Sequence, residues 1–185
     1  MPHPNLLRNG ETALVVIDVQ EAFRSVIPEF ATVASRISTA VRGFQLLNVP
    51  VLVTEQYPKG LGPTAEEITF VLPDDHAAFE KTAFSSCGAA PFVARLEELG
   101  TKQVVICGLE THICVSQTAH DLVDRGFQVH VLTDCVCSRF EYNKSAGLAK
   151  MNTAGVIPSS VEMALFELMR DSRHEQFKEI QALIK

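Results

Sequence analysis

Three side chains of the sequence stand where chemistry is expected: a carboxylate, a lysine and a thiol. Asp18 ends an otherwise apolar run, where the burial of an unpaired carboxylate would be costly. Cys114 follows another apolar run, at the point where a loop gives way to a helix, and the N-terminus of a helix stabilises a thiolate. Lys81 lies between Phe79 and Phe84, two apolar residues that would draw its side chain inward. If the three groups meet, Asp18 could remove the thiol proton and Lys81 would offset the negative charge.

Each of these residues also has a structural interpretation. Asp18 could instead cap a nearby backbone N–H or lie in a surface turn, Cys114 could pack as a small buried hydrophobe, and Lys81 could be a solvated surface residue. His112 is a second candidate base for Cys114, but the stiffness of the chain places two such near neighbours poorly for contact. The other cysteines are expected to be reduced and to serve packing: Cys87, Cys107, Cys135 and Cys137.

The elements that must position these residues follow from the hydrophobic pattern. Continuous apolar runs with β-branched residues predict buried strands over 12–18, 51–54, 103–108 and 127–134, with a short strand at 155–157. Helical spacing and turn signals predict helices over 29–48, 88–99, 113–125, 142–153, 160–170 and 174–185. Residues 55–78 predict a long loop with a short helix near 64–68.

Strands that alternate with helices predict a three-layer α/β/α fold over residues 1–185, as a single domain. Its sheet is expected to be doubly wound, mainly parallel and of about six strands. Ligands bind such folds beyond the carboxyl ends of the strands. This rule selects Asp18, the Thr54-Glu55 pair and the loop at 108–114 as site candidates.

Composition excludes several classes of function. A net charge of −6 with no dense basic cluster argues against a nucleic-acid partner. No apolar run approaches the roughly 20 residues that span a bilayer, and Met1 to Gly10 lack the apolar core of a signal peptide, so we expect a cytoplasmic protein without membrane contact. Of the five cysteines, the only close pair is Cys135-x-Cys137, whose spacer is too short for the usual zinc knuckle.

Three segments of the sequence carry a family resemblance. LVVIDVQEAF (14–23), KTAFSS (81–86) and GLETHICVSQTAHDLVDRGFQVHVLTD (108–134) resemble the isochorismatase-like cysteine hydrolases, which include nicotinamidases and N-carbamoylsarcosine amidohydrolases. TEQYPKGLGPT (54–64) and HEQFKEIQALIK (174–185) look closer to the isochorismatase domain-containing proteins. The resemblance runs from about residue 12 to residue 185.

The resemblance implies roles for particular residues. It makes Asp18, Lys81 and Cys114 the catalytic residues and implies a cis peptide between Leu109 and Glu110, whose N–H would face an oxyanion together with that of Cys114.

Two departures from the family's patterns narrow the prediction. Nicotinamidases carry a metal-binding Asp-x-His pattern after the second strand, whereas residues 54–57 contain no histidine, so no metal or other cofactor is expected. The family members that cleave isochorismate typically lack the cysteine, so Cys114 argues against that substrate.

Six further residues are candidates for substrate contact: Gln20, Phe23, Glu55, Tyr57, Phe84 and His112. Several alternatives stay open for them. Gln20 could fix the local loop or contact Asp18, Glu55 and Tyr57 could support the loop at 55–78, and the two phenylalanines could belong to the core.

The sequence thus predicts a hydrolase that cleaves a small amide or related C–N bond through a thioester on Cys114. One alternative is a member of the family that binds a small molecule or a protein without turnover, and another is a nicotinamidase. By resemblance we expect a homo-oligomer, a dimer or tetramer. The apolar stripe of Phe177, Ile180 and Ile184 is a candidate contact surface, although it could equally dock onto its own domain.

Overall fold

A parallel sheet forms the centre of the molecule, and the computed structural model describes residues 3–185. The strands are β1 (Thr12–Ile17), β2 (Val51–Gln56), β3 (Phe79–Lys81), β4 (Gln103–Leu109), β5 (Gln128–Cys137) and β6 (Ile157–Ser159). They lie in the order β3-β2-β1-β4-β5-β6, and every neighbouring pair is parallel. β1 and β4 are buried at every residue, which is why their sequences are continuously apolar rather than alternating.

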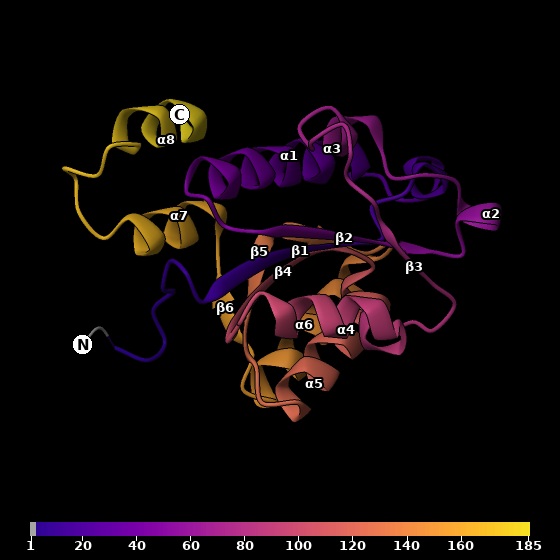
Figure 1. Cartoon of the computed structure of the whole chain (residues 1–185). Coiled ribbons are helices and arrows are strands. Elements are labelled where there is room, and N and C mark those ends of the chain that lie inside the picture. Colours follow the sequence, from indigo (N-terminus) through magenta and orange to yellow (C-terminus); the bar gives the residue numbers. More distant parts are fainter. Residues whose placement is uncertain (1–2) are drawn as a thin grey trace.

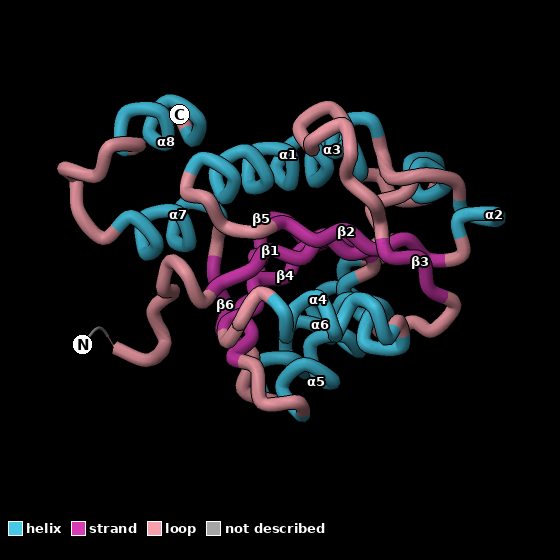
Figure 2. Tube along the Cα trace, viewed as in Figure 1, coloured by secondary structure: helices cyan, strands magenta, loops and turns pink. Residues whose placement is uncertain are grey.

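Helices cover both faces of the sheet (Figure 1). One face carries α1 (Phe30–Leu46), α3 (Glu66–Thr69), α7 (Val161–Met169) and α8 (Phe177–Ile184), and the other carries α4 (Ala90–Glu98), α5 (Ser116–Asp124) and α6 (Glu141–Thr153). Figure 2 shows the short α2 (Pro58–Leu61) beyond the edge of the sheet next to β3. The predicted doubly wound α/β/α fold with about six strands is confirmed. No helix within residues 3–185 is long and apolar enough to cross a membrane.

Two hydrophobic cores lie on either side of the sheet, and β1 contributes to both. Leu14 and Val16 pack in the core beneath α1, whereas Ala13, Val15 and Ile17 pack in the core beneath α4 and α5. Successive side chains of a strand point to opposite faces, so a shift of one residue would exchange the two sets. This packing fixes the register of β1 and therefore the position of the residue that follows it.

The strand order changes direction between β1 and β4, which are neighbours in the sheet but not consecutive in sequence. In doubly wound folds, ligands bind outside the carboxyl ends of the strands at such a switch point. The residue after β1 is Asp18, and the segment after β4 begins at Glu110. The topology therefore selects the same end of the sheet that the sequence selected.

Local structure differs from the sequence prediction at three places. The edge strand β3 was not predicted, because three residues that include Glu80 and Lys81 carry no apolar pattern. α2 is a helix within the predicted loop. The helix predicted from residue 113 begins earlier, in a π-helical turn. The π-helical turn is η3 (Thr111–Val115), and two short 3-10 helices are η1 (Glu21–Ser25) and η2 (Ser86–Gly88).

The apolar stripe at the C-terminus docks onto its own domain. Ile180 of α8 is fully buried in the core beneath α1, and Phe177 and Ile184 pack against that core. The Phe177 ring meets Phe166 of α7 edge-on, with 6.2 Å between ring centroids. Of the two uses predicted for this stripe, the structure shows the intramolecular one.

A buried histidine on β5 gives the stability of this fold a pH dependence. His130 is 1% exposed, its Nε2 atom has no hydrogen-bond partner within residues 3–185, and burial lowers its pKa to about 4. Between the unfolded pKa, ~6.5, and this value the unfolded chain binds a proton that the folded chain does not, so stability falls as the pH falls through this window.

We therefore expect the free energy of unfolding to decrease by about 1 kcal/mol between pH 7.5 and pH 5.5 because of His130 alone. Urea unfolding at the two pH values measures this change. The variant His130→Leu is the control, because it keeps the site apolar and cannot titrate. If wild type and variant change equally over this interval, His130 does not cause the pH dependence.

Candidate active site

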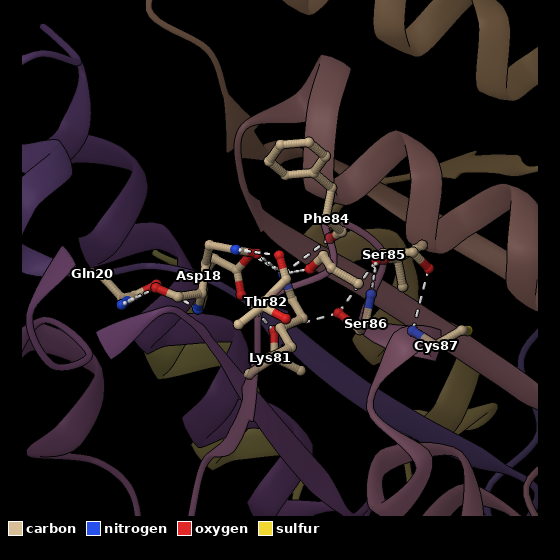
Figure 3. Close-up of polar contacts among 12 residues, drawn as sticks. Asp18, Gln20, Lys81, Thr82, Phe84, Ser85, Ser86 and Cys87 are labelled. Carbon is tan, nitrogen blue, oxygen red and sulfur yellow. Dashed lines mark hydrogen bonds and ion pairs between the residues drawn. The ribbon is translucent and has the colours of Figure 1, made fainter. Parts of the chain in front are cut away.

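A buried ion pair joins the ends of two strands. Asp18 directly follows β1, and Lys81 is the last residue of β3. The Lys81 Nζ atom lies 2.6 Å from the Asp18 Oδ2 atom, and both side chains are fully buried (Figure 3). Asp18 adopts a left-handed backbone conformation, with φ of 53°. Such conformations are uncommon outside glycine and gather at functional sites, where the surrounding structure maintains them.

Acceptors surround the Lys81 ammonium. Besides Asp18, three acceptors lie within hydrogen-bond distance of its Nζ atom: Gln56 Oε1 at 2.8 Å and the carbonyl oxygens of Phe84 and Ala83 at 2.9 and 3.2 Å. An ammonium group is only a donor, so acceptors of this kind match its chemistry. Gln56 is itself fixed, because its Nε2 atom donates to the Thr82 carbonyl. The charged end of Lys81 is thus held at one position below the loop that follows β3.

Cys114 lies in η3, between β4 and α5, and its side chain is nearly buried. Burial, and after it the negative charge of Asp18, raise the pKa of the thiol to about 12, against the opposing effect of the positive charge of Lys81. The helix N-terminus was expected to favour the thiolate, but burial outweighs that effect in this structure. The thiol is therefore neutral near pH 7, and a base must remove its proton before it can act as a nucleophile.

The peptide between Leu109 and Glu110 is cis, as the resemblance implied. The Glu110 carboxylate turns towards Arg139, whose backbone N–H and Nε lie 3.0 and 3.1 Å from Oε1. The Glu110 carbonyl accepts from the N–H groups of Ile113 and Val115. Among residues 3–185 the Glu110 N–H donates to no acceptor. That N–H is therefore free to donate to another acceptor.

Gly108 allows β4 to approach β1 at this end of the sheet. Its φ is 124°, and a Cβ atom on it would lie 2.0 Å from the carbonyl oxygen of Ile17. Only glycine fits such an approach. The close contact brings the start of the Leu109–Glu110 loop next to the residue that precedes Asp18.

Two of the predicted substrate contacts hold the loop after β2 instead. Gln20 is fully buried. Its side-chain nitrogen donates to the carbonyl oxygens of Gln56 and Gly62, and its side-chain oxygen accepts the backbone N–H of Gln56. Glu55 Oε1 accepts from the backbone N–H and the hydroxyl of Thr64. These contacts favour the loop-supporting alternative for both residues.

The other predicted contacts lie around the rim. Phe23 is half-buried and packs against the core beneath α1. Tyr57 is exposed and lines a pocket of about 410 Å³ together with Lys81. The Phe84 ring is exposed and points away from the ion pair (Figure 3). His112 pairs through Nδ1 with the Ser138 hydroxyl at 3.0 Å.

A second pocket, of about 350 Å³, is unrelated to these residues. It lies beside the amino end of β2, between Val51 and Leu99, and is lined by none of the predicted site residues. The carboxyl edge of the sheet, with its buried charges, is therefore the better candidate for the site.

Three polar residues that support the ion pair, directly or through Thr54, were not identified from the sequence: Gln56, Ser86 and Thr118. Thr54 was selected only by its position at a strand end. Its hydroxyl donates to Asp18 Oδ1 at 2.7 Å. Gln56 follows two residues later on the same face of β2 and was identifiable by that alternation. For Ser86 and Thr118, which are 32 positions apart, no pattern in the sequence signals the contact.

The segment after β2 does not fit the metal-binding pattern of nicotinamidases. The side chains of Thr54, Glu55 and Gln56 are committed to Asp18, Thr64 and Lys81 respectively. Within residues 3–185, no group of three or more His, Cys, Asp or Glu side chains is arranged to hold a metal ion.

The ion pair gives a prediction about stability. Lys81→Met leaves a buried carboxylate without its partner, so we expect the free energy of unfolding at pH 7 to fall by about 3–5 kcal/mol. The double variant Asp18→Asn/Lys81→Met removes both charges and is expected to recover much of this loss. Urea unfolding of wild type, both single variants and the double variant gives the coupling. Additive losses in the double variant would show that the two charges do not stabilise each other.

Comparison with known proteins places this geometry in a family. The model of the Isochorismatase domain matches residues 12–163. A relative described as "Secreted isochorismatase effector Isc1", from Phytophthora sojae, is 43% identical over 181 residues, which cover 94% of this chain and 84% of the relative.

Two further matches agree. "Isochorismatase domain-containing protein 2" of Danio rerio is 37% identical over 174 residues, 94% of this chain and 86% of the relative. The solved structure described as "MAR1 Ribonuclease from Caenorhabditis elegans" superposes with a TM-score of 0.92 at 36% identity, over 97% of this chain and 92% of that one. The family to which the chain belongs is therefore that of the isochorismatase domain.

Proposed function

We propose that this protein is a cysteine hydrolase that cleaves a small amide or related C–N bond through a thioester on Cys114. The observation that carries the proposal is the buried Asp18–Lys81 pair, whose two charges act on the neutral thiol of Cys114. A thiol that is neutral at pH 7 becomes a nucleophile only beside a base. Asp18 is the carboxylate whose charge acts most strongly on it.

The proposed reaction has two halves. In the first, the Cys114 sulfur attacks the substrate carbonyl while its proton passes to Asp18, and the N–H groups of Glu110 and Cys114 bind the oxyanion. The C–N bond then breaks, and the departing nitrogen takes the proton from Asp18. In the second half, water attacks the thioester, gives a proton to Asp18, and the acid leaves as the proton returns to the Cys114 sulfur.

Lys81 has an electrostatic role in this scheme. Its positive charge lowers the pKa of the Cys114 thiol and so opposes the effect of Asp18. When the thiol loses its proton to Asp18, the charge moves from carboxylate to sulfur, and Lys81 offsets it at both positions. The carbonyl and amide acceptors around Nζ keep the ammonium in place during this transfer.

The rival functions are RNA cleavage, nicotinamide hydrolysis and ligand binding without turnover. A net charge of −6 argues against the RNA cleavage that the name of the solved relative suggests. Nicotinamide hydrolysis is disfavoured because residues after β2 do not supply the metal pattern. A member that only binds its ligand would carry the same fold.

Homo-oligomer formation and a cytoplasmic location stay predictions from the sequence.

We expect a screen of small carboxamides and carbamoyl compounds to find a substrate whose ammonia or amine release depends on Cys114. In Cys114→Ala the turnover should fall by at least about 100-fold, because the variant has no group for the covalent step. The screen includes nicotinamide, with and without a chelator, and single-stranded RNA.

Rapid acid quenching and intact-protein mass spectrometry provide the second readout. Wild type should carry the mass of the substrate acyl group during turnover, on the peptide that contains Cys114. Hydrolysis that persists in Cys114→Ala, or RNA cleavage without amide hydrolysis, would contradict the proposed function. If the protein binds amides but never forms the acyl adduct, it is a member of the family that binds its ligand without turnover.

A further inference from the structure

A line of buried hydroxyl groups leads from helix α5 to the Asp18 carboxylate. The Thr118 hydroxyl donates to Ser86 Oγ at 3.2 Å, Ser86 Oγ to Thr54 Oγ1 at 3.4 Å, and Thr54 Oγ1 to Asp18 Oδ1 at 2.7 Å. All four residues are 0% exposed, so no solvent competes for these contacts. Figure 3 shows Ser86 on the segment that follows Lys81, near Asp18.

The chemistry of the groups fixes the direction of the line. An ionised carboxylate only accepts hydrogen bonds, so Thr54 must donate to Asp18. A hydroxyl has one proton, so Thr54 must then accept from Ser86, and Ser86 in turn must accept from Thr118. At the far end, Thr118 Oγ1 accepts the backbone N–H of Ser86 at 2.9 Å. Every hydroxyl proton in the line therefore points towards Asp18.

The line connects the base to the helix that follows the nucleophile. Thr118 lies on α5, four residues after Cys114. Thr54 belongs to β2 and Ser86 to η2, so the line crosses from α5 to the end of β1 through two other elements. Lys81 holds the second carboxylate oxygen, Oδ2. Both oxygens of Asp18 are thus held, Oδ1 by Thr54 and Oδ2 by Lys81.

The carboxylate keeps capacity for the thiol proton in this arrangement. Each carboxylate oxygen has two lone pairs, and Thr54 and Lys81 occupy one on each. A carboxylate held on both oxygens cannot rotate, so the remaining lone pairs keep a fixed direction. Fixed geometry is what proton transfer in a dry site requires.

We propose that the hydroxyls of Thr118, Ser86 and Thr54 form a one-way hydrogen-bond chain that holds Asp18 in the orientation in which it accepts the Cys114 proton. They are positioning residues, since they act through Asp18 and touch no reacting atom. The inference rests on the proposed function, because it assigns these hydroxyls a part in the same proton transfer.

The experiment measures the rate of Cys114 alkylation by iodoacetamide from pH 5.5 to pH 9, with the modified peptide identified by mass spectrometry. A thiol that reacts without help follows its thiolate fraction, so its rate rises about tenfold per pH unit below its pKa. A thiol that gives its proton to a held carboxylate reacts with a flatter profile. This readout reports proton removal and needs no substrate.

Thr54→Val removes the only donor to Asp18 Oδ1 that the structure shows, so its alkylation rate at pH 7 should fall by about tenfold and its profile should steepen. Thr118→Val breaks only the far end of the hydroxyl chain, so its alkylation rate at pH 7 should fall by about threefold. Thr54→Ser and Thr118→Ser keep the hydroxyls and should stay within about twofold of wild type.

The matched control is Thr12→Val. Thr12 is buried at the opposite end of β1, where its hydroxyl donates to the Arg8 carbonyl at 2.8 Å and lies 3.2 Å from Gln103 Oε1. This variant should lose stability, as Thr118→Val should, yet alkylate like wild type. Urea unfolding of every variant establishes that it is folded under the conditions of the assay.

Two outcomes overturn the proposal in different ways. If wild type shows the flat profile and both valine variants keep it while losing stability, the hydroxyls are structural only and the proposed hydrolase function survives. If wild type itself follows its thiolate fraction over the whole range, Cys114 has no working base, and the chain proposal and the proposed function fail together.

Discussion

A pair of opposite charges fully removed from water governs the arrangement of this site. Burial of Asp18 and Lys81 costs several kcal/mol of solvation free energy per ion, and contacts in the folded protein must offset this cost. These contacts come from Thr54 and Gln56 of β2 and from two carbonyl oxygens of the loop after β3. The loops at three strand ends are therefore organised around one buried dipole, and Cys114 lies in its field.

The topology explains how residues far apart in sequence reach this point. A parallel sheet places all carboxyl strand ends at one edge, and the change of direction between β1 and β4 opens that edge. Lys81 reaches Asp18 from the edge strand β3, and Gly108 lets the end of β4 come against Ile17. The two charges that act on the pKa of the Cys114 thiol come from residues far away in the sequence. The protonation of the thiol therefore depends on the assembly of the sheet.

Apolar runs were sufficient to predict β1, β2, β4 and β5, because strands buried on both faces must be continuously apolar. They could not predict β3, whose three residues carry two charges and whose pairing with β2 is decided by tertiary contacts. Strand ends and family resemblance selected Asp18, Lys81 and Cys114. The hydroxyl line escaped detection, because hydrogen bonds between Ser86 and Thr118 leave no periodic trace. Likewise, a glutamine such as Gln20 looks the same in sequence whether it binds a ligand or a loop.

The central claim is that Asp18 acts as a base for Cys114 and is more than a nearby negative charge. The two roles predict opposite signs for one measurement, the alkylation rate of Cys114 at pH 7 in Asp18→Asn relative to wild type. Loss of the charge alone would lower the thiol pKa and speed the reaction. Loss of the base slows it, and our account predicts a fall of at least about tenfold. A variant that reacts faster than wild type would contradict the account.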